Sequence, residues 1–203
     1  GGWARSPLKS QGSGDRLSKD DRRNSSSCPM LWPLVYEGRE AEIRASVGEE
    51  KAAALLGELA LVTRLTERVA DLFTATGMEL SSRHIEPLQL VRYLPGQQFE
   101  PHNDWFDRCD VREFLRGGER RLTVLIYLND LDDLDEPATA GGATSFPELG
   151  VRVRPQHTSA IYFENYVEGE LRGDGRCLHQ GEAPTASTKF AVNVWIRARP
   201  FKL

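Results

Sequence analysis

The sequence lacks several features that would define other classes of protein. It has no run of about 18 apolar residues, the length that a membrane-spanning helix needs. It has no long run of Lys or Arg, and its formal net charge is −4 over 203 residues. We therefore expect no binding to nucleic acid phosphates and no contact with an anionic membrane surface. The 39% of hydrophobic residues are enough to build the core of one globular domain.

Cysteine is also scarce. The three cysteines, Cys28, Cys109 and Cys177, form no Cys-x-x-Cys pair, so the spacing typical of a zinc site is absent. A disulfide between Cys109 and Cys177 stays open if the compartment is oxidising. Because the chain begins with Gly rather than Met, we expect a processed or excised segment whose compartment cannot be read directly.

The front of the chain divides into two parts of different composition. Residues 1–30 are rich in Ser, Gly and charged side chains, which predicts a flexible leader before a single domain at residues 31–203. From Glu49 to about Thr76, apolar residues recur at three- and four-residue spacing, which predicts one or two amphipathic helices. Gly77 is a suitable stop for the last of them.

After Pro87 the pattern changes to short runs of β-forming residues separated by turn-forming clusters. These runs lie at residues 88–93, 121–129, 151–154, 159–163 and 190–196. A helical front followed by irregularly spaced strands predicts an α+β, mainly β fold. It favours a β-sandwich or jelly roll braced by N-terminal helices over an alternating βαβ sheet.

Two of the four histidines lie in contexts suited to a metal. In an extended strand, residues i and i+2 point to the same face, so His102 and Asp104 can reach one ion. His179 lies 75 residues beyond Asp104, and a jelly roll could bring it opposite the pair. Two imidazoles and one carboxylate are the ligands of non-haem Fe(II) oxygenases. A His-x-Asp sequence alone is also common among surface polar pairs, so the surrounding sequence must decide.

Lys189 alternates with Ala191, Asn193 and Trp195 along the last predicted strand, on the face opposite the apolar residues of that strand. A lysine that points into a β-barrel needs an anion to offset its desolvation, so we expect a buried carboxylate partner. The alternative is a surface lysine at the start of the strand.

The sequence EPLQLVRYLPGQQFEPHNDWF, followed by RLTVLIYLND, GGATSFP and LHQGEAPTASTKFAVNVWI, resembles the catalytic domain of the prolyl 4-hydroxylase family of 2-oxoglutarate dioxygenases. The resemblance covers roughly residues 42–197. Three spacings match that family: nine residues from Tyr93 to His102, ten from His179 to Lys189, and six from Lys189 to Trp195.

The resemblance implies a double-stranded β-helix (jelly roll) core and a role for each candidate residue. Fe(II) would be bound by His102, Asp104 and His179. The co-substrate 2-oxoglutarate would be held by Lys189 and Tyr93, with Thr123 and Tyr127 as second choices that could instead only pack. The substrate would be contacted by Phe99, Arg120, Trp195 and Arg197. As alternatives, the two aromatic residues are core residues and the two arginines are solvated rim charges.

The implied activity is the hydroxylation of a proline in a peptide or protein, with O2 and 2-oxoglutarate consumed and ascorbate restoring the iron. An extended polyproline-like segment would suit such a site. Hydroxylation of another side chain or a small molecule, and an inactive jelly roll that acts as an interaction module, are the alternatives. A monomer is favoured, and the resemblance alone favours the endoplasmic reticulum or secretory lumen. Residues 107–119 are either a mobile lid or a plain connecting loop.

Overall fold

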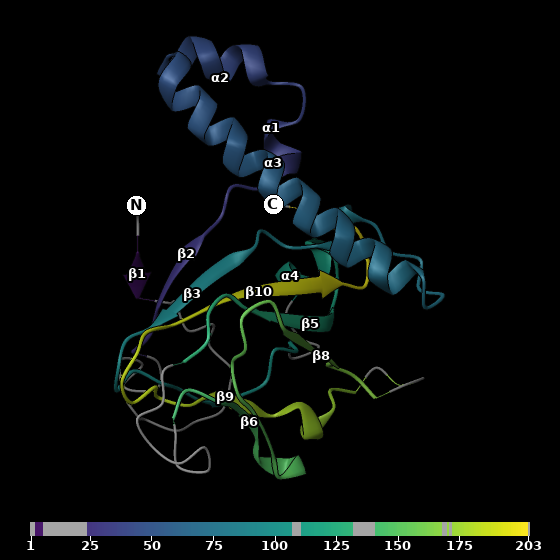
Figure 1. The fold of residues 1–203 in the computed structure, drawn as a ribbon. Helices are drawn as coiled ribbons and strands as arrows, with labels where there is room; N and C mark the ends of the chain where they lie inside the picture. Colours follow the sequence, from purple (N-terminus) through teal and green to yellow (C-terminus); the bar gives the residue numbers. More distant parts are fainter. Residues whose placement is uncertain are drawn as a thin grey trace.

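The computed structural model of the chain describes residues 3–5, 24–106, 111–131, 141–167, 170 and 172–202. Two antiparallel sheets and a layer of helices make up this part of the chain (Figure 1). The helices are α1 (Pro33–Tyr36), α2 (Glu40–Val47), α3 (Glu49–Thr74) and α4 (Val111–Leu115), and short 3-10 helices are η1 (Ser82–His84), η2 (Pro147–Leu149) and η3 (Gly175–Cys177). None of these helices combines the length and apolar composition of a membrane span.

The strands divide between a larger and a smaller sheet. The larger sheet has the order β1-β2-β3-β10-β5-β8, and the smaller sheet has the order β4-β9-β6-β7. Their bounds are β1 (Ala4–Arg5), β2 (Ser26–Pro29), β3 (Gln89–Tyr93), β4 (Phe99–His102), β5 (Arg120–Tyr127), β6 (Thr144–Phe146), β7 (Val151–Val153), β8 (Ala160–Glu164), β9 (His179–Gly181) and β10 (Lys189–Arg197). The strands of both sheets pair antiparallel, which confirms a sheet-rich fold with N-terminal helices.

Helix α3 confirms the predicted amphipathic helix as one unbroken helix of 26 residues. Its apolar stripe, which includes Val62, Val69 and Phe73, packs against one face of the larger sheet. The helix ends at Thr74, and the chain turns at Gly77 with φ of +90°. That backbone conformation favours glycine because it has no Cβ. The predicted helix and its stop are therefore both present.

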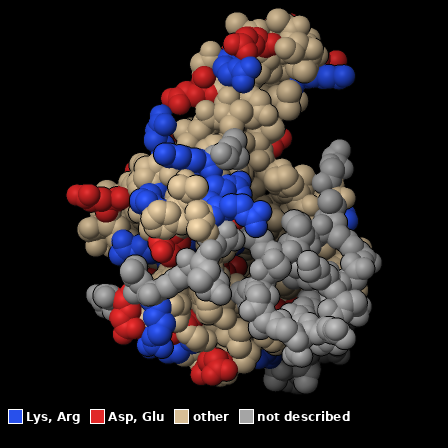
Figure 2. All heavy atoms as spheres, turned by 180° about the vertical axis from the view of Figure 1, so that it is seen from behind, with Lys and Arg blue, Asp and Glu red and all other residues tan. Residues whose placement is uncertain are grey.

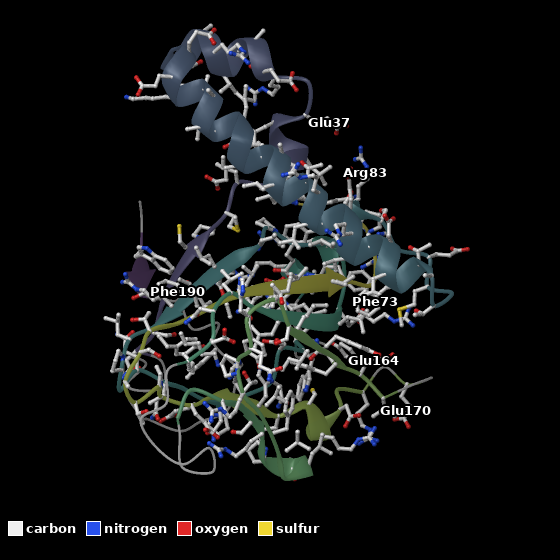
Figure 3. All side chains as sticks on the ribbon, in the orientation of Figure 1. Glu37, Phe73, Arg83, Glu164, Glu170 and Phe190 are labelled. Carbon is white, nitrogen blue, oxygen red and sulfur yellow. The ribbon has the colours of Figure 1, made fainter. Side chains whose placement is uncertain are left out.

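The core of the larger sheet depends on the alternation of side chains along β10. Val192, Val194 and Ile196 lie in the cluster that α3 covers, whereas Ala191 lies in a second cluster on the other face of the sheet. Figure 3 shows side chains filling the space between the two sheets. The smaller sheet therefore faces the side of β10 that carries Lys189 and Trp195.

One expectation about the chain needs correction, and several short strands were missed. The predicted leader includes β2, which pairs with β3 from Ser26 to Pro29 and so belongs to the larger sheet. Backbone pairing stabilises this segment although its side chains are small and polar. Three further strands, β4, β6 and β9, were not predicted, because they have only three or four residues and few β-branched side chains.

Candidate metal and co-substrate site

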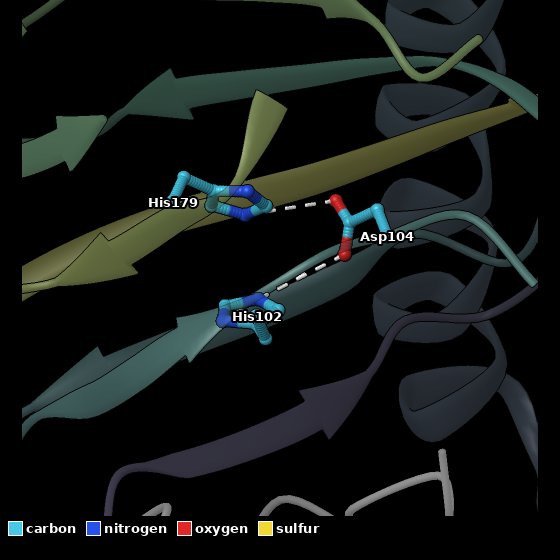
Figure 4. A group of neighbouring side chains, drawn as sticks. All are labelled: His102, Asp104 and His179. Carbon is cyan, nitrogen blue, oxygen red and sulfur yellow. Dashed lines mark ion pairs between the residues drawn. The ribbon is translucent and has the colours of Figure 1, made fainter. Parts of the chain in front are cut away.

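Strands β4 and β9 pair with His102 opposite His179, and this pairing brings the predicted metal ligands together. One ligand atom from each of His102, Asp104 and His179 lies within 4.8 Å of the others. Asp104 Oδ1 is 3.9 Å from His102 Nε2, and Asp104 Oδ2 is 3.8 Å from His179 Nε2 (Figure 4). His102 ends β4, so Asp104 reaches the cluster from the turn after the strand rather than from within it.

The two imidazoles are held in one orientation by backbone carbonyls, which also select the tautomer of the neutral ring. His102 Nδ1 lies 2.8 Å from the Glu100 carbonyl oxygen, and His179 Nδ1 lies 2.9 Å from that of Cys177. A carbonyl only accepts hydrogen bonds, so both Nδ1 atoms are the donors and the neutral rings carry lone pairs on Nε2. Both Nε2 lone pairs are thus available to a metal, and the Glu100 and Cys177 carbonyl oxygens hold the rings in place.

Asp104 is buried but remains a carboxylate. Burial raises its pKa, but His179, His102 and Arg120 and a hydrogen bond from Trp195 together lower the pKa to about 2. Thr123 Oγ1 donates to its Oδ2 at 2.8 Å, and Trp195 Nε1 donates to the same oxygen at 3.0 Å. Two donors on Oδ2 orient the carboxylate and leave Oδ1 without either of them.

Lys189 is 1% exposed and points between the sheets. Its Nζ donates to the Gly142 carbonyl oxygen at 2.8 Å and to Thr144 Oγ1 at 3.3 Å. Glu182 acts on its charge from farther away, but that carboxylate makes two hydrogen bonds to Arg152. Within the described part of the chain, no carboxylate oxygen lies within 4.0 Å of Lys189 Nζ. The surface-lysine alternative is therefore wrong, and the expected carboxylate partner is not supplied by these residues.

Two tyrosines form the walls around Lys189. Its Nζ lies 5.3 Å from the ring centroid of Tyr93 and 5.5 Å from that of Tyr127. Tyr127 donates to Thr144 Oγ1 at 2.9 Å, and burial raises the pKa of Tyr127 to about 12. A Cβ added at Gly181 would lie 3.0 Å from the Tyr93 hydroxyl, which makes glycine the residue that fits beside this ring. Of the second-choice residues, Tyr127 thus lies beside Lys189, whereas Thr123 contacts Asp104.

The two aromatic residues predicted to contact substrate lie against the metal-ligand cluster. Phe99 stacks on the His102 ring with centroids 3.6 Å apart. Trp195 is half-buried and uses its indole N–H on Asp104. Neither is a core residue remote from the site, and Trp195 supports a predicted ligand directly.

The two arginines predicted to contact substrate are buried in ion pairs. Arg120 donates to both oxygens of Glu86, at 2.6 and 2.9 Å, and its guanidinium lies 3.7 Å from the centroid of the Trp195 ring. Arg197 is 0% exposed and donates to Glu86 and to Glu113, each at 2.5 Å. The solvated-rim alternative is wrong for both, and the complete burial of Arg197 argues against its predicted contact with substrate.

Sequence reasoning missed the residues that support this site. Asn165 is fully buried and donates to Thr123 Oγ1 at 2.9 Å, so it extends the hydrogen-bond chain that ends on Asp104. Cys177 is a free, buried thiol whose backbone carbonyl orients His179, and burial raises its thiol pKa to about 12. Cys109, its suggested disulfide partner, lies outside the described residues. No local motif marks Asn165, because its partners come from distant strands.

Comparison with known proteins identifies the family. The profile of the 2OG-Fe(II) oxygenase superfamily matches residues 88–197, which contain the whole cluster and Lys189. The chain belongs to this superfamily, whose members use Fe(II) and 2-oxoglutarate. It is 35% identical over 153 residues to prolyl 4-hydroxylase subunit alpha-1 of Homo sapiens, and the match covers 73% of this chain and 26% of the human protein. The Gallus gallus subunit is also 35% identical, and the chain spans about a quarter of either relative.

A solved structure shows the same fold at lower identity. The viral collagen prolyl hydroxylase from Paramecium bursaria Chlorella virus-1, in its 2OG complex, aligns with a TM-score of 0.55 and 22% identity. The alignment covers 87% of this chain and 80% of that chain. The two chains thus share their overall fold.

The burial of Lys189 predicts a rise in stability with pH. Burial lowers its pKa to about 7 in the folded protein, whereas an unfolded lysine has a pKa near 10.4. Between these values the unfolded chain binds the proton and the folded chain does not, so stability increases with pH. We expect the protein without 2-oxoglutarate to gain about 2–3 kcal/mol in free energy of unfolding from about pH 7 to 9.5. Urea unfolding measures this gain, and Lys189→Met should remove it. An equal gain in both proteins would show that Lys189 is solvated.

Proposed function

We propose that the chain is an Fe(II)- and 2-oxoglutarate-dependent hydroxylase that acts on proline in peptides or proteins. The two sheets would be the halves of a double-stranded β-helix (jelly roll), with residues 31–203 as the catalytic domain and β2 added to it. The observation that carries the proposal is the pairing of a His/Asp/His cluster with a buried lysine that lacks a carboxylate partner among the described residues.

The cluster fits Fe(II) by the chemistry of its donors. Two imidazole nitrogens and one carboxylate oxygen are the ligand set of non-haem iron oxygenases, and they leave further coordination positions open. His102, Asp104 and His179 would hold the ion. Bound Fe(II), together with O2 and 2-oxoglutarate, supplies the oxidation of a C–H bond, and ascorbate would restore iron oxidised without substrate. The residues of this chain orient the ligands and exclude water from the site.

The surroundings of Lys189 suit the far carboxylate of 2-oxoglutarate. The desolvation that lowers the pKa of this ammonium would be offset by a bound anion, since a charge-assisted hydrogen bond is among the stronger ones. Tyr93 and Tyr127 would shape the pocket and limit its depth. Lys189 lies at the start of β10 and Trp195 lies farther along the same face, so the co-substrate would bind beside the proposed metal site.

A prolyl substrate is supported by the similarity of the chain to prolyl 4-hydroxylase subunits and by the aromatic residues at the site. Phe99 and Trp195 are half-buried beside the cluster, and aromatic side chains suit the preformed polyproline II conformation. Arg120 is 7% exposed and would contribute at most an edge of its guanidinium.

The decisive experiment is succinate release from 2-oxoglutarate in the presence of Fe(II), with and without a panel of proline-rich peptides. We expect peptide-dependent succinate release and a matching mass increase of one oxygen in the peptide. His102→Ala, Asp104→Ala and His179→Ala should each abolish turnover. Their cooperative unfolding should persist, because the core under α3 does not depend on the cluster. His157→Ala, a histidine outside the cluster, is the control and should keep full activity. Turnover that survives the loss of Asp104 would contradict the proposed metal site.

Lys189 is the residue at which the co-substrate assignment can be tested most directly. Lys189→Ala should weaken 2-oxoglutarate binding by roughly ten- to a hundredfold, since a charged hydrogen bond contributes about 1.5–3 kcal/mol. Lys189→Arg should recover only part of the affinity, because the planar guanidinium differs in shape from an ammonium. Equilibrium binding without O2 at saturating Fe(II) measures both variants, with exposed Lys51→Ala as the control. Unchanged affinity in Lys189→Ala would refute the assignment.

Trp195 should act on the metal through Asp104. Trp195→Phe keeps an aromatic ring but removes the N–H that donates to Asp104 Oδ2, and losing such an outer-shell partner commonly weakens metal binding by about 10- to 100-fold. Calorimetric titration with Mn(II) as a stable substitute for Fe(II) measures this change. Trp32 packs on Phe201 away from the cluster, so the control variant Trp32→Phe should bind the ion like the parent. Parent-like binding by Trp195→Phe would show that the indole serves packing or substrate alone.

A further inference from the structure

Helix α4 presents large apolar side chains to the solvent. This helix has five residues, and its three large apolar side chains are exposed: Val111 by 65%, Phe114 by 52% and Leu115 by 67%. Exposed apolar side chains are common singly, but a cluster of them marks a contact surface. The only acidic residue of this helix, Glu113, is turned inward to Arg197. The outward face of α4 therefore carries no carboxylate.

Cationic side chains surround this apolar cluster. The Arg199 guanidinium lies 4.1 Å from the centroid of the Phe114 ring and donates to the Phe114 carbonyl oxygen. The backbone of Lys202 donates to Arg116, whose side chain is 41% exposed. Among the residues that the structure describes, neither Arg199 nor Lys202 has a carboxylate within 4.0 Å. Arg116 has only a 3.8 Å contact with Glu113, whose other oxygen bonds to Arg197.

This concentration of positive charge runs against the net charge of the protein. The whole chain has a formal charge of −4, yet Lys and Arg side chains gather on one face beneath the projecting hairpin of α2 and α3 (Figure 2). We name the surface formed by Val111, Phe114, Leu115, Arg116, Arg199 and Lys202 the α4 surface. Two of its cations, Arg199 and Lys202, have no described carboxylate within 4.0 Å. Cations beside exposed aliphatic and aromatic side chains are complementary to a segment that carries Asp or Glu among aliphatic residues.

The α4 surface is joined to the candidate site by a continuous set of contacts. Glu113 binds Arg197, and Arg197 shares Glu86 with Arg120. The Arg120 guanidinium stacks on the Trp195 indole, and this indole donates to Asp104, a predicted metal ligand. Val111 also follows Asp104 by only seven residues, which span at most about 25 Å. An extended peptide could therefore occupy the site and the α4 surface at the same time.

We propose that the α4 surface docks an acidic, aliphatic segment of the polypeptide substrate, flanking the residue that reacts. This inference rests on the proposed function for the site but concerns a different part of the molecule. Docking outside the site would increase the effective concentration of the reacting segment without any new contact at the metal. It would also select among proline-containing chains by the charge of their flanks.

The test uses short fluorescent peptides and charge-reversed proteins. One peptide joins a proline-rich segment to an Asp/Leu-rich flank, a second has Lys in place of Asp, and a third has the acidic flank without proline. The test variant is Arg199→Glu with Lys202→Glu, and the matched control is Lys51→Glu with Arg64→Glu on the exposed face of α3. Both double variants change the net charge equally, so only position distinguishes them.

Fluorescence anisotropy gives the outcome without iron or turnover. We expect the parent to bind both acidic-flank peptides more tightly than the Lys peptide, with affinity that falls as salt is added. The test variant should lose roughly tenfold in affinity, while the control stays within about twofold. Phe114→Ser, at an exposed position, should weaken binding without altering the unfolding midpoint.

Three results would overturn the docking proposal. The first is equal binding of the acidic and Lys peptides, and the second is an equal effect of the two double variants. The third is strong binding to phosphatidylserine vesicles that acidic peptides do not displace, which would make the surface a membrane contact. The proposed function fails separately, since absent succinate release with intact acidic-peptide binding contradicts the oxygenase and leaves the α4 surface standing.

Discussion

Successive side chains of β10 point to opposite faces of the larger sheet, and this alternation separates the core of the protein from its candidate site. Val192, Val194 and Ile196 face α3 and are at most 3% exposed. Lys189 and Trp195 face the smaller sheet, where the predicted metal ligands lie. A one-residue shift in the register of β10 would exchange these two sets. The hydrophobic packing under α3 therefore holds the polar side chains at their positions.

The charged groups on the inner side are mostly arranged in pairs. A buried ion pair is costly to desolvate and tolerates little change in geometry, so it orients its members more than it stabilises the fold. Glu86 accepts from two arginines and ties the end of β10 to the start of β5. Lys189 departs from this pattern, because its hydrogen-bond partners among the described residues are the Gly142 carbonyl and the Thr144 hydroxyl. Its burial therefore fits a site completed by an anion from outside the chain.

The same ion pairs connect two surfaces with different tasks. The proposed metal and co-substrate site lies between the sheets, where rigid strands can hold ligand geometry. The α4 surface lies outside, on a short helix whose single acidic residue is buried against Arg197. This burial leaves the exposed side of α4 apolar and surrounded by cations. The chemistry would thus depend on residues of the sheets, whereas recognition of the flanking polypeptide would depend on α4 and the C-terminal segment.

The sequence by itself determined the elements whose signal is local. The periodic apolar stripe of α3, the long runs of β5 and β10, and the residues of the His/Asp/His motif were all readable because helices and strands impose short, regular spacings. Only the tertiary structure decided the short strands β4, β6 and β9, whose few residues carry little propensity of their own. It also decided that Arg197 is buried, because its carboxylate partners are distant in the sequence. Glu113 lies 84 positions away and Glu86 lies 111 positions away. Burial and ion pairing are properties of contacts between distant segments, and no local pattern encodes them.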